Sequence, residues 1–190
     1  EELCRTVDAW KDMEGTAVRS RVALLCGFES EYAFRLQLQT AGFYYMEQLQ
    51  AFHDAFSHYG VNVDIISQEA DLEGYDIVVA PAMYVRSQKA VRQLHDFASS
   101  GGIVLLTTRS GVKDEHNNCI MSPLPAGYVD MTGCFVEEYD ATGTDKIMIT
   151  MDGEDYMGTH WCDVIRTEGA EVLAVYKENF YAGRPAITQN

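Results

Sequence analysis

The chain has 190 residues, of which 47% are hydrophobic and four are prolines. This length allows one well-buried core and is short for two, so we expect a single domain. The net charge of -15 and the pI near 4.5 argue against nucleic acid and anionic membranes as partners, because both are bound through clustered Lys and Arg. No stretch approaches the ~20 consecutive apolar residues of a membrane-spanning helix.

The cysteines and the chain start indicate the cellular setting. Five cysteines are scattered without any Cys-x-x-Cys spacing, at Cys4, Cys26, Cys119, Cys134 and Cys162. We therefore expect free thiols in a reducing compartment, the cytoplasm, with no disulfide or metal role. The first residues, EELCRTVDAW, are not a signal peptide, and they open on Glu rather than Met. We interpret residues 1–20, which are polar and helical in character, as a segment separate from a domain at 21–190.

The first half of the chain alternates strand and helix patterns. Short continuous apolar runs predict strands at 21–26, 61–66, 76–80 and 103–108. Apolar residues three or four apart predict helices at 44–59, stopped by Gly60, and at 86–98, stopped by Gly101 and Gly102. The stretch FESEYAFRLQLQTAG, which lies between the first predicted strand and the helix at 44–59, is polar and aromatic, and it receives no element. The pattern indicates an α/β fold of flavodoxin-like layout, a three-layer sandwich with a mainly parallel sheet between helices.

The second half is less regular. The segments CFVEEYD, KIMITM and EVLAVYKENFYAG have strand lengths and alternating or continuous apolar character, and GEDYMGTHWCDVI lies between the last two. We expect these segments to extend the sheet, with some antiparallel pairing at its edge.

One loop carries acids beside an imidazole, in the stretch TTRSGVKDEHNNC. Adjacent Asp114, Glu115 and His116 cannot easily converge on one metal ion, because helical ligands need a spacing of three or four and strand ligands a spacing of two. Two interpretations stay open. The loop is either a solvated surface, or a contact for a ligand or partner, since loops after parallel strands line the crevices of such sheets.

Other catalytic patterns are weak. The chain contains no Gly-x-Cys-x-Gly or Gly-x-Ser-x-Gly elbow, and Cys26 at the end of the first strand has the pattern of a buried thiol more than of a nucleophile. The turn CGFESEYAF has one glycine and two glutamates, which disfavours phosphate, FMN and dinucleotides. Glu137 and Glu138 point to opposite faces of a strand. We predict no catalytic residue, cofactor or metal in this chain.

Several segments, in order, resemble the middle domain of glycoside hydrolase family 42 β-galactosidases. They are RVALL, YYMEQLQAFHDAFSHYGVNVDII, YDIVVAPAMYV, FASSGGIVLLTTRSGVKDEHN, WCDVI, GAEVLAVY and FYAGRPAITQN. The resemblance implies a fold related to class I glutamine amidotransferases, serving as a trimerisation domain. It further implies that the catalytic glutamates of a retaining enzyme lie in a preceding (β/α)8 barrel, and that residues 1–20 are the exit from that barrel. Where the family tends to carry Asp-Trp-Glu-Asn, this chain has GFESEYAF, which keeps Glu29 and loses the tryptophan.

The resemblance makes a homotrimer, and contact with the barrel, the expected partnerships. Contact candidates at an interface or the barrel are Glu29, Tyr44, Tyr84, Ser110, Gly111, Asp114 and Glu115. A second set is expected either at the surface or equally in the core, and consists of Phe43, Tyr44, Tyr45, Met83 and Tyr84.

Two rival functions remain open from the sequence. A stand-alone amidotransferase-like enzyme or small-molecule-binding domain would need a reactive thiol and a pocket near Gly27, Pro81 and Ser110. A sugar-binding module is suggested by the eleven tyrosines, although they form no concentrated platform.

Overall fold

A parallel sheet forms the first half of the molecule, which is a computed structural model describing residues 2–190. The sheet has four strands in the order β2-β1-β3-β4, and all neighbours run parallel. The strands are β1 (Val22–Cys26), β2 (Val63–Ser67), β3 (Ile77–Ala80) and β4 (Ile103–Leu106). All four strands predicted in this half are confirmed, and they produce a mixed α/β fold.

Helices pack on both faces of this sheet because successive strand residues point in opposite directions. Leu24 faces a core cluster shared with α2 (Phe28–Leu36) and α3 (Tyr45–His58). Leu25 faces the opposite cluster, shared with α4 (Gln88–Ser99). Helices α3 and α4 confirm the two predicted helices within a few residues.

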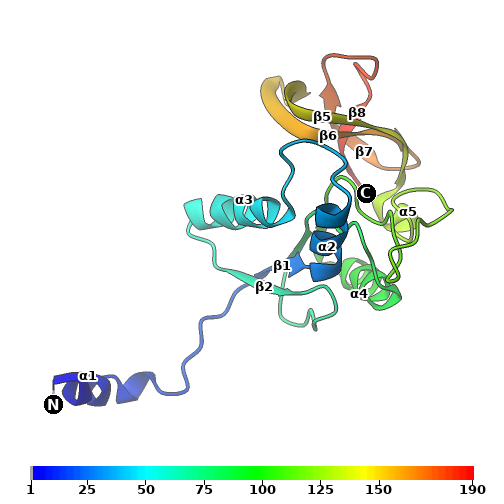
Figure 1. The fold of residues 1–190 in the computed structure, drawn as a ribbon. Helices are drawn as coiled ribbons and strands as arrows, with labels where there is room; N and C mark the ends of the chain where they lie inside the picture. Colours follow the sequence, from blue (N-terminus) through cyan, green and yellow to red (C-terminus); the bar gives the residue numbers. More distant parts are fainter. Residues whose placement is uncertain (1) are drawn as a thin grey trace.

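Helix α2 occupies the stretch that received no element from the sequence. Only Ser30, Ala33 and Phe34 of this helix are buried, and the rest of its surface is open. Large apolar residues such as Phe28 and Leu36 stand among its exposed positions, and they obscure the helical period in the sequence. Figure 1 shows α2 between the parallel sheet and the second half of the chain.

The second half forms its own sheet, which corrects the prediction that it extends the first. Its order is β6-β5-β7-β8, all antiparallel. The elements are α5 (Val129–Thr132), β5 (Cys134–Met151), β6 (Glu154–Thr167), β7 (Glu171–Tyr176) and β8 (Pro185–Gln189). The physical reason is that β5 and β6, of 18 and 14 residues, pair with each other through a tight turn at Asp152 and Gly153. Register shifts in this pair, such as the one between Val136 and Glu138, interrupt the alternation that an antiparallel sheet with one solvated face would otherwise produce.

The two halves share part of their cores. Trp161 of β6 belongs to the cluster that also contains Leu24, Phe34 and Tyr84 of the parallel half. The antiparallel sheet keeps a small core of its own around Ile147, Cys162, Val164, Tyr176 and Tyr181.

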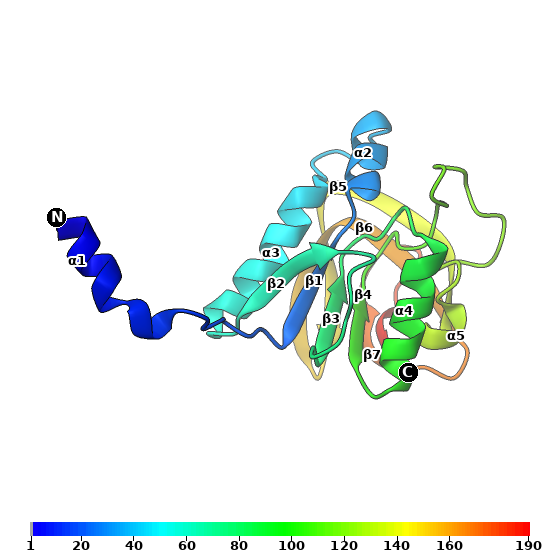
Figure 2. The same ribbon diagram turned by 90° about the horizontal axis from the view of Figure 1, so that it is seen from below.

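The N-terminal segment lies apart from this body. It contains α1 (Glu2–Ala9) and the 3-10 turn η1 (Lys11–Met13), neither of which has a buried residue. Figures 1 and 2 both show the segment projecting away from the sheets. The predicted helical character of the first residues is therefore confirmed. In the described part of the chain, no helix combines the length and apolar character needed to cross a membrane.

Candidate functional site

The turn after β4 has a strained backbone, and its apex residue is Arg109. Arg109 has a φ of 62°, in the left-handed region that non-glycine residues seldom adopt. Sharp, strained turns after a strand are how many α/β hydrolases present a nucleophile. Here the turn holds a guanidinium where such enzymes hold Ser or Cys.

The guanidinium of Arg109 is enclosed by aromatic rings. Its central carbon lies 3.9 Å from the ring centroid of Tyr139, 4.6 Å from that of Trp161 and 5.4 Å from that of Tyr84. Nη2 donates to Oε1 of Gln39 over 2.6 Å, and only 4% of the residue is exposed. We call these four partners the Arg109 cage. Because Tyr139 and Trp161 belong to β5 and β6, the cage ties the second half of the chain to the first.

Asp163 of β6 adds a polar link to the same turn. Its Oδ2 accepts a hydrogen bond from the backbone N–H of Arg109 over 3.3 Å, while its Oδ1 is buried. Burial raises the pKa of the Asp163 carboxyl group, and hydrogen bonds from Thr108 and Arg109 offset this in part. The carboxylate thus serves as an acceptor inside the molecule.

Hydroxyl groups satisfy the backbone where the parallel strands end. Ser110 Oγ accepts from the N–H of Met83 over 3.1 Å and donates to the carbonyl of Thr107 over 2.8 Å. Thr107 Oγ1 accepts from the N–H of Ala82 over 2.7 Å. Gly111 follows with a φ of 69°, and a Cβ there would lie 2.8 Å from the backbone N and O of Ala126. Ser110 and Gly111 are therefore buried structural positions, and neither residue is exposed at the surface.

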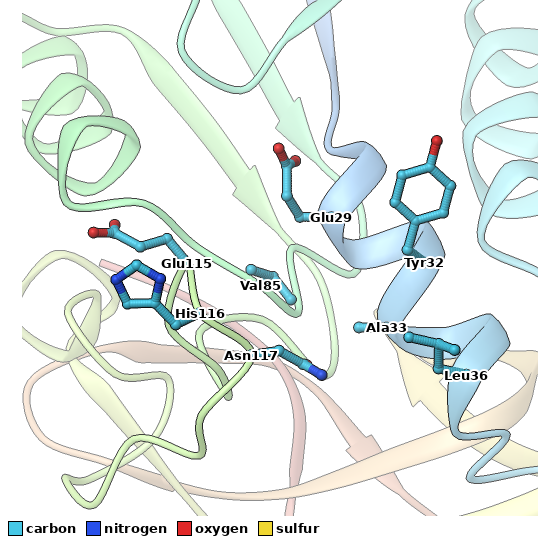
Figure 3. Close-up of a pocket in the computed structure, with 8 residues that line it drawn as sticks. All are labelled: Glu29, Tyr32, Ala33, Leu36, Val85, Glu115, His116 and Asn117. Carbon is cyan, nitrogen blue, oxygen red and sulfur yellow. The ribbon is translucent and has the colours of Figure 1, made fainter.

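A surface pocket lies between α2 and the loop that follows Lys113 (Figure 3). Its volume is about 260 Å³. The lining residues are Glu29, Tyr32, Ala33 and Leu36 from α2, Val85, and Glu115, His116 and Asn117 from the loop. In Figure 3 the two groups face each other across Val85. Two predicted contact residues, Glu29 and Glu115, are brought together here from positions far apart in the sequence.

Asp114 lies beside this pocket and organises the loop. Its Oδ1 accepts from the backbone N–H groups of His116 and Asn118 over 2.9 and 2.8 Å, and its Oδ2 accepts from Nδ2 of Asn118 over 3.2 Å. The hydrogen bonds to Asn118 are the main reason why the pKa of Asp114 is held below its usual value. The carboxylate is directed to its own loop, and its predicted role as a contact stays a prediction.

The structure separates the aromatic candidates. Tyr44 is 57% exposed, whereas the other four, Phe43, Tyr45, Met83 and Tyr84, are each at most 6% exposed. Tyr84 stacks on Phe34 with ring centroids 4.6 Å apart and accepts a hydrogen bond from Gln39. The ring of Tyr84 is therefore part of the core, one of the two placements left open for it, and its role as an interface or barrel contact stays a prediction. Tyr44 remains available at the surface.

The thiols do not have the environment of a nucleophile. Burial, together with Glu31 and Glu29, raises the pKa of Cys26. Burial also raises the pKa of Cys162. A reactive thiol needs the opposite shift. Pro81 and Ser110, which the enzyme alternative placed beside a pocket, are buried. Within residues 2–190, no cluster of three or more His, Cys, Asp or Glu residues is arranged to hold a metal ion.

Sequence reasoning missed two features of this region. The first is the outward face of α2, where Phe28, Tyr32 and Leu36 are 59%, 59% and 82% exposed. Their spacing of four residues was the available signal. The second is the Arg109 cage, which joins positions up to 70 residues apart, as in the bond between Arg109 and Gln39. No local pattern could have indicated it.

Comparison with known proteins identifies the domain type. A family model described as the β-galactosidase trimerisation domain matches residues 20–190. The β-galactosidase BgaA of Clostridium cellulovorans is 35% identical over 191 residues, covering 100% of this chain and 29% of its own length. The crystal structure of the β-galactosidase from Bacillus circulans sp. alkalophilus has a TM-score of 0.93 at 27% identity, covering 100% of this chain and 29% of that one.

A third relative links the domain to the glycosidase family. The GH42 β-galactosidase of G. stearothermophilus has a TM-score of 0.90 at 28% identity, again covering 100% of this chain but only 28% of that one. The chain thus spans less than a third of each of these relatives. With the family model matching almost its whole length, the chain belongs to the β-galactosidase trimerisation domain family, as the resemblance in its sequence predicted.

Proposed function

We propose that residues 21–190 are the subunit-assembly domain of a homotrimeric, cytoplasmic β-galactosidase that hydrolyses terminal β-D-galactosides. In this proposal the domain is not itself catalytic, and residues 1–20 lead into it from a catalytic (β/α)8 barrel. The membership of the trimerisation domain family supports assembly as the role. The five cysteines, all unpaired, support a reducing compartment.

The single observation that carries the non-catalytic role is the state of Arg109. At the strand end where an α/β enzyme would expose a nucleophile, this chain has a cation that is 4% exposed and packed against Tyr139 and Trp161. A guanidinium has no nucleophilic or general-base function at neutral pH, because it stays protonated. We further propose that the parallel half is a flavodoxin-like, amidotransferase-related scaffold whose strand-end turn kept its shape and took on a structural task.

The test compares the full-length protein with a version that lacks residues 21–190. Light scattering coupled to gel filtration reports the mass of each, circular dichroism reports folding, and hydrolysis of a chromogenic galactoside reports the barrel. We expect a trimer for the intact protein and a monomer for the folded deletion variant. A deletion variant that folds and remains trimeric overturns the proposal.

The enzyme alternative has its own discriminating measurement. An amidotransferase-like enzyme would be inactivated by a thiol reagent at neutral pH through a nucleophilic cysteine, with loss of glutaminase activity. We expect neither glutaminase activity nor rapid modification of Cys26, because its raised pKa leaves little thiolate.

A further inference from the structure

The outward face of α2 carries an apolar stripe flanked by charged side chains of the same helix, among them the 73% exposed side chain of Arg35. Phe28, Tyr32 and Leu36 follow one another at a spacing of four residues, so they form one stripe on the helix. The rings of Phe28 and Tyr32 lie 6.5 Å apart, which makes the first part of the stripe continuous. The opposite side of the helix is apolar too, since Ala33 and Phe34 enter the core. A surface helix normally turns polar residues to water, and a contiguous exposed apolar stripe marks an interaction site.

The pocket beside α2 continues this stripe and adds charge. Tyr32 and Leu36 belong to both, and Val85 supplies an apolar floor. Glu29 of α2 and Glu115 of the loop line the pocket from opposite sides. In Figure 3 the Glu115 carboxylate points away from α2, and Oε2 of Glu29 accepts a hydrogen bond from Nε2 of Gln68 over 3.3 Å. At about 260 Å³ the pocket is below the ~300–1,000 Å³ typical of small-molecule sites. Its size and lining suit one long side chain with an apolar stem and a positive head.

A second copy of the same patch cannot be the partner. Two copies face to face would bring the Glu29 and Glu115 side chains of both into one contact, and like charges at close range are unfavourable. A three-fold ring also excludes it, because each contact in such a ring joins two different patches. The occupant must therefore be a different surface that combines apolar side chains with Arg or Lys.

The domain itself has few basic side chains left to offer. Residues 21–190 contain 11 of the 14 Lys and Arg residues of the chain, and Arg86, Arg109 and Lys113 among them are buried. Five more form ion pairs with carboxylates of the described residues, namely Arg21, Arg35, Arg166, Lys177 and Arg184. The complementary surface is more readily supplied by the parts of the protein outside this domain, since relatives of this chain are more than three times its length.

We propose that Phe28, Tyr32, Leu36, Glu29 and Glu115, together the α2 surface, bind a basic and apolar patch of the neighbouring subunit in the trimer. An Arg or Lys of that subunit enters the pocket between the two glutamates, and apolar side chains cover the stripe. This inference rests on the proposed assembly function and names the surface that performs it.

The first experiment removes the apolar part in the full-length protein. Tyr32→Ser with Leu36→Ser changes two outward side chains, so the fold should survive, which circular dichroism and thermal unfolding check. The mass is followed by sedimentation over a dilution series. We expect the trimer to dissociate at protein concentrations at least about 30-fold higher than for the wild type, because a hot spot worth ~2 kcal/mol is lost at each of its interfaces. The matched control is Tyr59→Ser, which removes an 82% exposed tyrosine directly after α3 and should leave the mass unchanged.

The second experiment reverses the charge. Glu115→Lys should weaken the trimer, and added salt should reduce the difference from the wild type, because the introduced repulsion is screened. Glu73→Lys, on an exposed turn far from α2 in the sequence, has the same change of net charge and should have no effect on the mass.

The outcomes separate this inference from the assembly function. If the deletion of residues 21–190 gives monomers while the α2 variants stay trimeric at every concentration, the domain assembles through another surface and the inference fails alone. If the deletion variant is also trimeric, both fail. If the α2 variants keep their mass but lose thermal stability, the surface packs within its own subunit, which also overturns the inference.

Discussion

The backbone N–H of Arg109 donates to Oδ2 of Asp163 across 3.3 Å, joining the turn after β4 to the middle of β6. The two residues are 54 positions apart and belong to different sheets. The same arginine has its guanidinium 4.6 Å from the ring centroid of Trp161. One residue therefore binds the second half of the molecule through both its backbone and its side chain.

Removing the Arg109 side chain should be costly. Arg109→Ala leaves a cavity among Tyr84, Tyr139 and Trp161 and loses the cation–π contacts, so we expect the free energy of unfolding to fall by about 2–4 kcal/mol. Chemical denaturation of the chain measures this. Arg35→Ala is the control, since the Arg35 side chain is 73% exposed in a 3.8 Å ion pair and should cost less than about 0.5 kcal/mol. Equal effects of the two substitutions would show that the cage contributes nothing.

Asp163 should make stability fall as pH rises. Because burial raises the folded-state pKa above the unfolded value of about 3.9, the folded chain holds the proton more tightly between these two values. The cost of the charge is complete above the folded pKa and disappears below about pH 4. Asp163→Asn should therefore raise the melting temperature near neutral pH, with the gain shrinking on acidification.

Asp155 offers a control of opposite sign. Lys177, at 2.7 Å, is the main cause that holds the pKa of the Asp155 carboxyl group below its usual value. Its contribution is present above the ordinary Asp pKa and is lost as pH falls through the lowered pKa. Asp155→Asn should lower stability slightly at neutral pH. A gain from Asp155→Asn, or a pH-independent effect of Asp163→Asn, would contradict this assignment.

Gly111 should not tolerate a side chain. A Cβ at this position would lie 2.8 Å from the backbone of Ala126 with φ at 69°. Gly111→Ala should cost about 2–4 kcal/mol, from overpacking plus the left-handed backbone. Gly153 has a φ of 86° in the β5–β6 turn, with nothing within 4 Å of the added Cβ, so Gly153→Ala should cost only about 1–2 kcal/mol. Urea unfolding of both variants compares the two, and a larger loss at Gly153 would refute the packing argument.

Asp114 should act on its loop before it acts on turnover. Asp114→Ala removes the acceptor for the N–H groups of His116 and Asn118, so their amide exchange should accelerate. In the full-length protein we expect weaker assembly or stability with turnover per assembled trimer retained. Asp114→Asn keeps one acceptor oxygen and should have the smaller effect. A correctly assembled Asp114→Ala variant without turnover would count against this interpretation.

The cysteines should divide by exposure. Cys4 and Cys119 are exposed and should react with a thiol reagent at neutral pH, whereas Cys134 and Cys162 are buried and should be slow. Cys26 should also be slow, because its pKa is raised. Peptide mapping after timed labelling identifies each site. Rapid modification of Cys26 would revive the enzyme alternative.

The sequence predicted the parallel half well because its signals are local. A short apolar run indicates strand β1, and apolar residues at helical spacing indicate helices α3 and α4. Both patterns can be recognised without knowing which distant residues these elements contact. Prediction from the sequence failed where contacts between distant residues determine the structure. Strands β5 and β6 pair with each other and leave the first sheet, and only their mutual register reveals this. Helix α2 was missed because the large apolar residues Phe28, Tyr32 and Leu36 stand among its exposed positions, so no uniformly polar face marked the helical period.

The same division appears in the site. Glu29 and Glu115 were chosen separately and meet at one pocket, since parallel strands deliver their following loops to one edge. Tyr84 was left open between surface and core, because nothing near it in the sequence predicts that the rings of Phe34 and Trp161 belong to the same cluster.

The position of Trp161 has a consequence for how the chain is made. Because this ring completes the cluster around Leu24 and Tyr84, the first 133 residues hold every strand of the parallel sheet yet lack a closing piece of its core. We expect the parallel half to complete its core only once the β5–β6 hairpin has been synthesised and Trp161 can pack beside Tyr84 and Arg109. A chain shortened before residue 161 would lack this part of the core. It should therefore expose apolar side chains and be prone to association through them.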